Sequence, residues 1–410
     1  MGCGLVSLGL VLKLFGDRPP LREIVGDEWY GQLMTIKEVL AELDRKVFKH
    51  KSPVKECRHP LLVNASLLGR ATQREVPATD ARAGGAAEAL RAMKFASAAY
   101  GCELLVALGM LPPGALAETA GGESHAENDL RRALAAHCGE RDVRYFHPGG
   151  PGVPSHYVAL LGDGSCVLGV RGTSNLNDAL TDVAAKDESL FDDGSPCRAH
   201  GGILAAAKAI AAGPAFGHVV SARKVVVTGH SLGAGAAFLA ALFLARDRRN
   251  LDVECFAFAP PPTVSACAVP RNLDCRTFVH DNDCVPTLSL RSVAVVLEAL
   301  LAVDAAEIGA KERLRLLAAG DASECKAALA AARPKTSDLA EEFPHLAHVG
   351  PVFHLRDGAL FKTQFPASIY LHPRMVLDHL QSHYEEALAN ATKAERVVDD
   401  GAAPRRSCGP

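Results

Sequence analysis

In the second half of the chain, short apolar runs alternate with longer stretches of helical periodicity. HYVALLG at 156–162 and CVLGVRG at 166–172, separated by a turn, predict two strands. RKVVVTG at 223–229 and ECFAFAP at 254–260 are almost continuously apolar, which is typical of parallel strands buried on both faces. Because helical stretches separate these runs, the order predicts an α/β fold, a mostly parallel sheet covered by helices. Two later strands are predicted at 276–281 and 352–355.

The flanking segments are helical or mixed in pattern. Residues 86–111 have helical periodicity without proline before residue 112, and they predict one long helix. Residues 290–345 are rich in alanine and leucine and predict a helical insert. Residues 1–85 combine proline pairs with charge clusters and predict a separate N-terminal extension, expected to be helical, while residues 391–410 predict a C-terminal tail.

The amino-acid composition argues against several classes of protein. Hydrophobic residues make up 48% of the 410 positions and charged residues 22%, which excludes a chain disordered throughout. A net charge of −3 and 5% aromatic residues argue against a nucleic-acid-binding protein. The 12 cysteines include no C-x-x-C pair, and the acidic residues at 187–193 lack a twelve-residue calcium loop. We therefore expect no cofactor, no metal and reduced thiols, as in a cytoplasmic protein.

The first residues raise the question of membrane attachment. The apolar stretch from Leu5 to Leu12 is too short to span a bilayer, and no basic residue precedes it as in a secretory signal. Gly2 and Cys3 are candidate acylation sites, but Val6 stands where myristoylation favours serine or threonine. We expect an unmodified terminus and at most peripheral contact with membranes.

One motif in this pattern carries chemistry. Residues 229–233 match G-x-S-x-G and lie between a predicted strand and a predicted helix. At such a turn the serine adopts a strained backbone conformation that presents its hydroxyl above the sheet. Larger side chains two positions away would clash, so Gly229 and Gly233 suit the turn. We predict Ser231 as the nucleophile and expect His230 to be packed and hydrogen-bonded beneath it.

A serine nucleophile needs a base, and the base needs a carboxylate to orient it. In this kind of fold the chain order is serine, acid, histidine. Asp281 and Asp283 both follow the strand at 276–281; the loop fixed by Pro286 favours Asp283 and leaves Asp281 as the alternative. His379 and His383 follow the last predicted strand, and spacing does not choose between them. The other later candidates are His345, His348, His354 and His372.

The negative charge that develops on the substrate requires two hydrogen-bond donors. The backbone N–H of Leu232, next to the nucleophile, is expected to be one of them. Thr173 follows the predicted strand at 166–172 and offers a backbone N–H and a hydroxyl as the other.

These residues together resemble the class 3 lipases, and within that family the sn-1-specific diacylglycerol lipases. The resemblance extends over residues 86–390, and its most specific blocks are VRGTSNLNDALTDV (170–183) and VVVTGHSLGAGAAFLAAL (225–242). The other matching blocks are KFASAAYG (94–101), AHGGI (199–203), CFAFAPPP (255–262), FVHDNDCVP (278–286) and MVLDHLQSHYEEAL (375–388).

The resemblance implies an α/β-hydrolase fold over residues 86–390, with residues 290–345 as a regulatory insert and a lid within residues 174–199. It selects Asp283 through the family's D-x-V-P pattern and His379 through D-H-x-x-x-x-Y, which ends at Tyr384. The catalytic residues that it implies are Ser231, Asp283 and His379, with Thr173 and Leu232 as oxyanion donors.

The implied activity is hydrolysis of an acyl ester of diacylglycerol to a fatty acid and a monoacylglycerol. A phospholipase A1, a galactolipase or a general carboxylesterase could use the same residues. A non-catalytic lipase-like signalling scaffold is less favoured, because every member of the triad has a candidate. Animal members of the family carry four transmembrane helices before the catalytic domain, and none is expected here. The expected partner is therefore a lipid substrate at a membrane or droplet interface.

Overall fold

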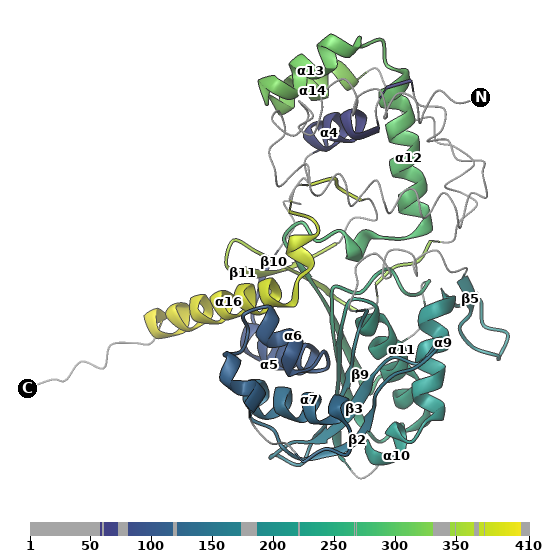
Figure 1. Cartoon of the computed structure of the whole chain (residues 1–410). Helices are drawn as coiled ribbons and strands as arrows, with labels where there is room; N and C mark the ends of the chain where they lie inside the picture. The colour runs from purple at the N-terminus through teal and green to yellow at the C-terminus, as the bar shows by residue number, and fades with distance from the viewer. Residues whose placement is uncertain are drawn as a thin grey trace, which may run out of the picture.

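The computed structural model describes most of the chain from Arg58 to Ala402. A large sheet with helices on both faces forms one body, and a smaller group of helices packs against one end of it (Figure 1). Residues 1–57 and 403–410 lie outside the described residues, as do the predictions made for Gly2 and Cys3. The internal gaps are at 60, 73–80, 118–120, 174–186, 220–221, 266, 268, 331–344, 349, 365–368 and 373.

The main sheet has nine strands in the described residues, in the order β1-β11-β10-β9-β8-β7-β4-β3-β2. Its central strands β4, β7, β8, β9 and β10 are parallel, and the strands at both edges are antiparallel. A separate hairpin pairs β5 with β6. The strands are β1 Ala81–Ala83, β2 Val143–His147, β3 His156–Leu160, β4 Cys166–Val170, β5 Asp187–Ser189, β6 Arg198–His200, β7 Lys224–His230, β8 Asp252–Phe258, β9 Leu273–His280, β10 Val352–Arg356 and β11 Ala359–Thr363.

The predicted α/β class is confirmed by this topology. Each predicted strand is present, as β3, β4, β7, β8, β9 and β10 in chain order. The apolar runs that became β4, β7 and β8 are buried over most of their length because helices cover both faces. The pattern did not predict the short edge strands β1, β2 and β11.

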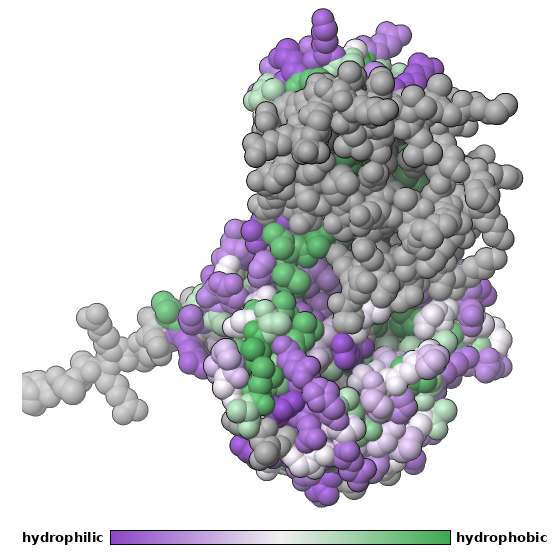
Figure 2. Space-filling model, in the orientation of Figure 1, coloured by the Kyte–Doolittle hydropathy of each residue, from purple (hydrophilic) through white to green (hydrophobic). Residues whose placement is uncertain are grey.

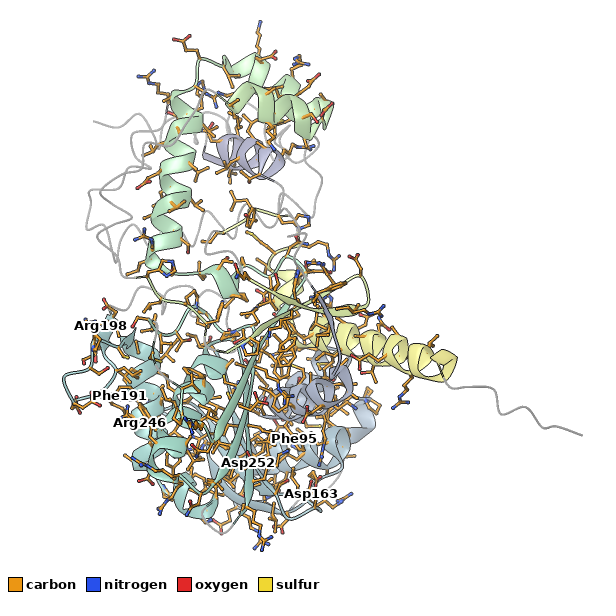
Figure 3. All side chains as sticks on the ribbon, turned by 180° about the vertical axis from the view of Figure 1, so that it is seen from behind. Phe95, Asp163, Phe191, Arg198, Arg246 and Asp252 are labelled. Atoms are coloured by element: carbon orange, nitrogen blue, oxygen red, sulfur yellow. The ribbon has the colours of Figure 1, made fainter. Side chains whose placement is uncertain are left out.

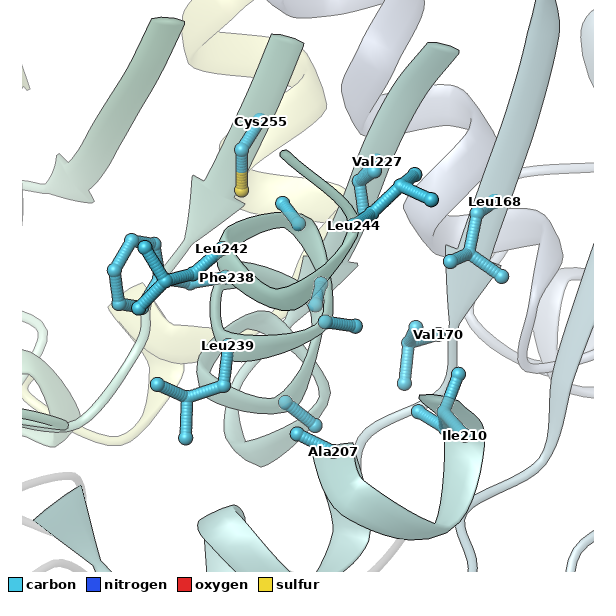
Figure 4. Packing of buried hydrophobic residues seen from close by; sticks show 14 of the residues in the cluster. Leu168, Val170, Ala207, Ile210, Val227, Phe238, Leu239, Leu242, Leu244 and Cys255 are labelled. Atoms are coloured by element: carbon cyan, nitrogen blue, oxygen red, sulfur yellow. The ribbon is translucent and has the colours of Figure 1, made fainter. Parts of the chain in front are cut away.

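Two layers of helix enclose the sheet (Figure 1). On one face, α11 lies between the sheet and α9 and is buried almost all round, as its alanine-rich sequence allows (Figure 4). On the other face lie α5, α6, α7 and α16. The helices of the main body are α5 Ala86–Ala98, α6 Cys102–Ala107, α7 His125–Ala133, α9 Gly201–Ala212, α10 Ala215–Val219, α11 Leu232–Asp247 and α16 Gln381–Ala402. The short helical turns are η2 Pro113–Ala117, η3 Leu134–Cys138, η4 Val285–Thr287 and η5 Leu377–His379.

The prediction of one long helix over 86–111 is wrong, because the chain turns at Gly101. This glycine has a φ of 92°, and a Cβ there would lie 1.9 Å from Asp129 Oδ2. Helical periodicity continues on both sides of the turn, so the apolar pattern alone did not reveal it. Two shorter helices, α5 and α6, result.

One helix of the N-terminal extension, α4 Leu61–Ala71, packs against the helices of the insert. Helices α12 Leu290–Ala305, α13 Ala310–Ala319 and α14 Ala322–Leu329 surround α4, which comes from the predicted extension. We call these four helices the cap. Its core continues into Cys284 and Val285 of the loop after β9 and into Met375 before η5. The cap therefore packs on both loops that carry the predicted acid and base.

A buried arginine ties the cap helices to one another. Arg313 is fully buried, and it donates to Asn64 Oδ1 at 2.9 Å and to the Val303 carbonyl at 2.8 Å. Asp304 accepts from Asn64 Nδ2 at 2.9 Å and from the His59 backbone N–H at 2.8 Å. These bonds satisfy polar groups that would be costly to bury alone.

The C-terminal helix is longer than predicted. Helix α16 runs on through residue 391, the predicted start of the tail, to Ala402. None of the helices in the described residues combines the length and apolar character needed to cross a bilayer.

Candidate active site

The turn between β7 and α11 presents Ser231 in a strained conformation. Ser231 has a φ of 60° and a ψ of −134°, in the left-handed region that non-glycine residues rarely adopt. A Cβ on Gly229 would lie 2.5 Å from the Gly233 carbonyl oxygen, and a Cβ on Gly233 would lie 2.5 Å from Gly172 N. Both glycines are therefore required by close backbone contacts.

Three side chains from three separate loops meet at this turn. His379 Nε2 lies 3.0 Å from Ser231 Oγ, and His379 Nδ1 lies 2.9 Å and 3.1 Å from the two carboxylate oxygens of Asp283. All three residues are buried. When Nδ1–H donates to the carboxylate, Nε2 is left to accept the serine proton. The geometry is therefore that of a serine, a base and an orienting acid.

The carboxylate of Asp283 is held by neighbours other than His379. Tyr384 donates its hydroxyl proton to Asp283 Oδ2 at 2.8 Å, and the Val285 backbone N–H donates to Oδ1 at 2.9 Å. The Tyr384 hydroxyl also accepts from the His280 backbone N–H at 3.0 Å. Burial and the adjacent Asp283 charge raise the pKa of Tyr384 well above its ordinary value, so it stays a donor.

The alternative acid and the other histidines lie elsewhere. Asp281 lies beside His280, with 3.5 Å between Oδ2 and Nε2, and burial raises its pKa. Among the described histidines after β9, His379 is the one bonded to Ser231. The others serve the fold or the surface: His348 and His354 bond the Pro286 and Asp281 carbonyls, His372 accepts from Arg374 N, His383 lines a pocket beside His280, and His345 is exposed.

The two predicted oxyanion donors flank the serine. Leu232 is the first residue of α11, so its N–H has no acceptor one turn earlier in the helix. Thr173 follows Gly172, whose backbone contacts the elbow at Gly233. The Thr173 hydroxyl is buried and has no hydrogen-bond partner among the described residues. A buried hydroxyl without a partner is unfavourable, unless a substrate oxygen completes it.

A second histidine supports the base from behind. His230 Nε2 donates to the His379 carbonyl at 2.9 Å, and His230 Nδ1 lies 3.3 Å from the Tyr100 hydroxyl. Burial and the neighbouring His379 hold the pKa of His230 well below 6.5, so the ring is neutral with its proton on Nε2. The sequence placed His230 beneath the nucleophile, but its bond is to the backbone of the base.

Sequence reasoning gave no role to Tyr100 or Tyr384. Both lie in blocks that carried the family resemblance, KFASAAYG and the D-H-x-x-x-x-Y pattern. Their roles depend on contacts with residues more than 100 positions away, which no local pattern displays.

One group in the described residues has the composition of a metal site, outside the triad. It comprises His280, Asp281 and Asp378. Asp378 already accepts from Arg374 Nε at 3.1 Å and from the Asn282 backbone N–H at 3.1 Å. An arginine on this carboxylate supplies the positive charge that a cation would bring.

The chain resembles known lipases over the segment that carries the elbow. The family model described as Lipase (class 3) matches residues 167–293. Diacylglycerol lipase-beta of Mus musculus is 40% identical over 107 residues, which is 24% of this chain and 16% of that protein. This chain therefore spans about a sixth of the length of that curated relative.

Solved structures give more distant likenesses. A triacylglycerol lipase described as having a serine protease triad at its catalytic centre is 17% identical, with a TM-score of 0.45 over 73% of this chain and 95% of that one. The Rhizomucor miehei triacylglyceride lipase is 19% identical, with a TM-score of 0.38 over 51% and 77%. A Penicillium expansum triacylglycerol lipase is 12% identical, with a TM-score of 0.40 over 69% and 86%.

Proposed function

We propose that the chain is a serine lipase that hydrolyses diacylglycerol at the sn-1 ester, on the support of the class 3 lipase match over residues 167–293. The products would be a fatty acid and a monoacylglycerol. The hydrogen-bonded chain from Ser231 through His379 to Asp283 carries the proposal. The 40% identity to a diacylglycerol lipase supports the substrate class.

The reaction follows from the positions of these side chains. Ser231 Oγ attacks the acyl carbonyl while His379 Nε2 takes the hydroxyl proton, and Asp283 stabilises the imidazolium. The oxyanion accepts hydrogen bonds from the Leu232 N–H and from Thr173. The ester C–O bond then breaks as His379 returns the proton to the glycerol oxygen. Water, deprotonated by His379, hydrolyses the acyl-enzyme and restores Ser231.

An insoluble substrate requires the site to meet a lipid surface. Residues 104–117 contain no charged side chain, and Leu116 is 37% exposed. Figure 2 shows hydrophobic side chains over α6 and near η5 on one face of the molecule. Leu377 and Leu380, beside the base, are partly exposed as well. We propose that this apolar face rests on a bilayer or droplet and that the chain is peripheral there.

The activity is tested with diacylglycerols that carry different fatty acids at sn-1 and sn-2. Release of the sn-1 fatty acid by the full chain, and its loss in Ser231→Ala, is the expected result. Preferential cleavage of a phospholipid or a galactolipid in the same panel would replace diacylglycerol as the substrate. Hydrolysis that survives in Ser231→Ala would refute the triad.

Surface docking is tested separately by sedimentation with phosphatidylcholine vesicles that contain diacylglycerol. In a Ser231→Ala background, Leu116→Glu should lower the bound fraction at least threefold. Val397→Glu is the matched control, because Val397 is 72% exposed and belongs to α16 rather than to the segment at 104–117. Equal binding by the two variants would exclude the apolar face as the docking surface.

A further inference from the structure

Two half-buried cysteines lie together although they are far apart in the chain. Cys197 ends the loop of the β5–β6 hairpin, and Cys267 lies in the segment after β8. The two thiols are neighbours, and Cys197 contributes to the raised pKa of Cys267. Both also border the core cluster around α11. This pair has no role in the proposed hydrolysis.

The backbone that follows Cys197 is held in register with the backbone that precedes Cys267. Ser265 N donates to the Arg198 carbonyl at 2.9 Å, and Arg198 N donates to Ser265 Oγ at 2.8 Å. An antiparallel bridge joins Ala199 to Val264. Because the bonded residues lie within three positions of each cysteine, the two sulfur atoms cannot separate far without breaking these bonds.

Accessibility distinguishes this pair from the other neighbouring cysteines. Cys255 and Cys275 are also register partners, on β8 and β9, but they are 0% and 4% exposed within the sheet. A reagent in solution cannot reach them without unfolding. Cys197 and Cys267 are both partly exposed, so a small disulfide can approach them.

We propose that Cys197 and Cys267 are a redox site that forms a reversible disulfide by exchange with a small-molecule disulfide such as oxidised glutathione. Cys197 loses its proton to water and attacks one glutathione sulfur, which releases one glutathione thiolate that is then protonated. Cys267 loses its proton and attacks the Cys197 sulfur, which releases the second glutathione. Two protein thiols are oxidised, and one glutathione disulfide is reduced to two thiols.

The order of the two steps follows from the environment of each thiol. Burial, with the neighbouring Cys197, raises the pKa of Cys267 to about 11. Cys267 therefore keeps its proton at neutral pH in the absence of an adjacent electrophile, and it reacts second. Cys197 is assigned the first attack.

The disulfide would fasten the β5–β6 hairpin to the core; residues 174–186 of the predicted lid at 174–199 lie outside the described residues. The hairpin loop is already held by Arg246, which lies 3.7 Å over the Phe191 ring and 3.1 Å from Asp193 Oδ2 (Figure 3). A covalent link at Cys197 would add a bond that thermal motion cannot break. This consequence for turnover rests on the proposed function, whereas disulfide formation does not.

The experiment incubates the purified full chain in a series of glutathione redox buffers and maps disulfides by mass spectrometry of unreduced peptides. The expected product is a peptide pair linked through Cys197 and Cys267, with a loss of two hydrogen masses that dithiothreitol reverses. Cys197→Ser and Cys267→Ser should each abolish the pair, whereas Cys138→Ser should keep it. Cys255 and Cys275 should stay alkylatable only after unfolding.

The oxidised chain should also unfold at a temperature at least about 3 °C higher than the reduced chain. Its turnover on emulsified diacylglycerol should fall at least threefold relative to that on a soluble short-chain ester. The absence of the linked peptide across the series, or linkage of Cys197 to another cysteine, would overturn the site. A disulfide that leaves the ratio of the two turnovers unchanged would overturn the effect of the fastened hairpin on turnover.

Discussion

Replacing Thr173 with valine separates a catalytic role for this residue from a structural one. Valine has nearly the same shape as threonine and lacks the hydroxyl. In the free protein the Thr173 hydroxyl is buried without a partner in the described residues, so the replacement breaks no hydrogen bond to any of them. A buried hydroxyl without a partner costs about 1–3 kcal/mol. The free energy of unfolding of Thr173→Val should therefore be unchanged or higher by up to that amount.

Catalysis should respond in the opposite direction. Loss of one oxyanion donor lowers kcat by about 10² to 10³, which corresponds to about 2.7–4 kcal/mol of transition-state stabilisation. KM should change little, because the hydroxyl bonds an oxygen whose charge develops only in the transition state. The loss of about 2.7–4 kcal/mol of transition-state stabilisation and the gain of up to about 3 kcal/mol in folding stability therefore have opposite signs.

The assay measures kcat and KM on a soluble p-nitrophenyl ester together with urea unfolding. Thr173→Ser is the matched control, since it keeps the hydroxyl and should retain at least a third of the wild-type kcat. A Thr173→Val variant with kcat within threefold of wild type would refute the role of the hydroxyl. A loss of stability above 1 kcal/mol would show instead that the hydroxyl has a partner in the folded chain.

Three further predictions concern the acid, the cap and the pH dependence of stability. Asp283→Asn should lower kcat about 10⁴-fold by favouring the wrong tautomer of His379, while Asp281→Asn stays within threefold of wild type. Arg313→Met should lower the free energy of urea unfolding by about 3 kcal/mol or more, because Arg313 is fully buried among carbonyl acceptors. Arg315 is exposed on the same helix, so Arg315→Met should lower that free energy by less than about 1 kcal/mol. Burial lowers the pKa of His348 from 6.5 to about 4, so below pH 6.5 the unfolded chain binds this proton first, and about 3 kcal/mol of stability is lost by pH 4. His348→Gln should flatten that loss between pH 7 and pH 4.5, and equal slopes for variant and wild type would exclude this imidazole as its source.

The strands and the nucleophile could be predicted from the sequence because the patterns that indicate them extend over only a few residues. A run such as RKVVVTG, which is apolar on both faces, is expected only where both faces of the strand are buried. It therefore predicts a central strand of the sheet. The two glycines around Ser231 indicate a close backbone approach, and a Cβ added at either glycine would lie 2.5 Å from a backbone atom. The turn at Gly101 was missed, since a single glycine within a helical pattern does not show whether a neighbour such as Asp129 will pack against it.

The base and its supports required tertiary information. Spacing left His379 and His383 equivalent, although they lie one helical turn apart in the chain. In the folded chain η5 carries His379 to Ser231, whereas His383 lines a separate pocket. The packing of α4 from the extension against the insert could not be foreseen for the same reason, because it joins segments more than 200 residues apart.

The sequence by itself determined the class of fold, the serine and the loops in which its acid and base had to lie, because periodicity and backbone sterics act over a few residues. Spacing left the aspartate and the histidine open, and the family resemblance selected Asp283 and His379. Tertiary structure alone decided that these two side chains reach Ser231, that Tyr384 and His230 hold them, and that the cap packs on both loops. Those outcomes depend on distances between atoms brought together by burial of the whole core, and such distances are properties of the fold rather than of any segment.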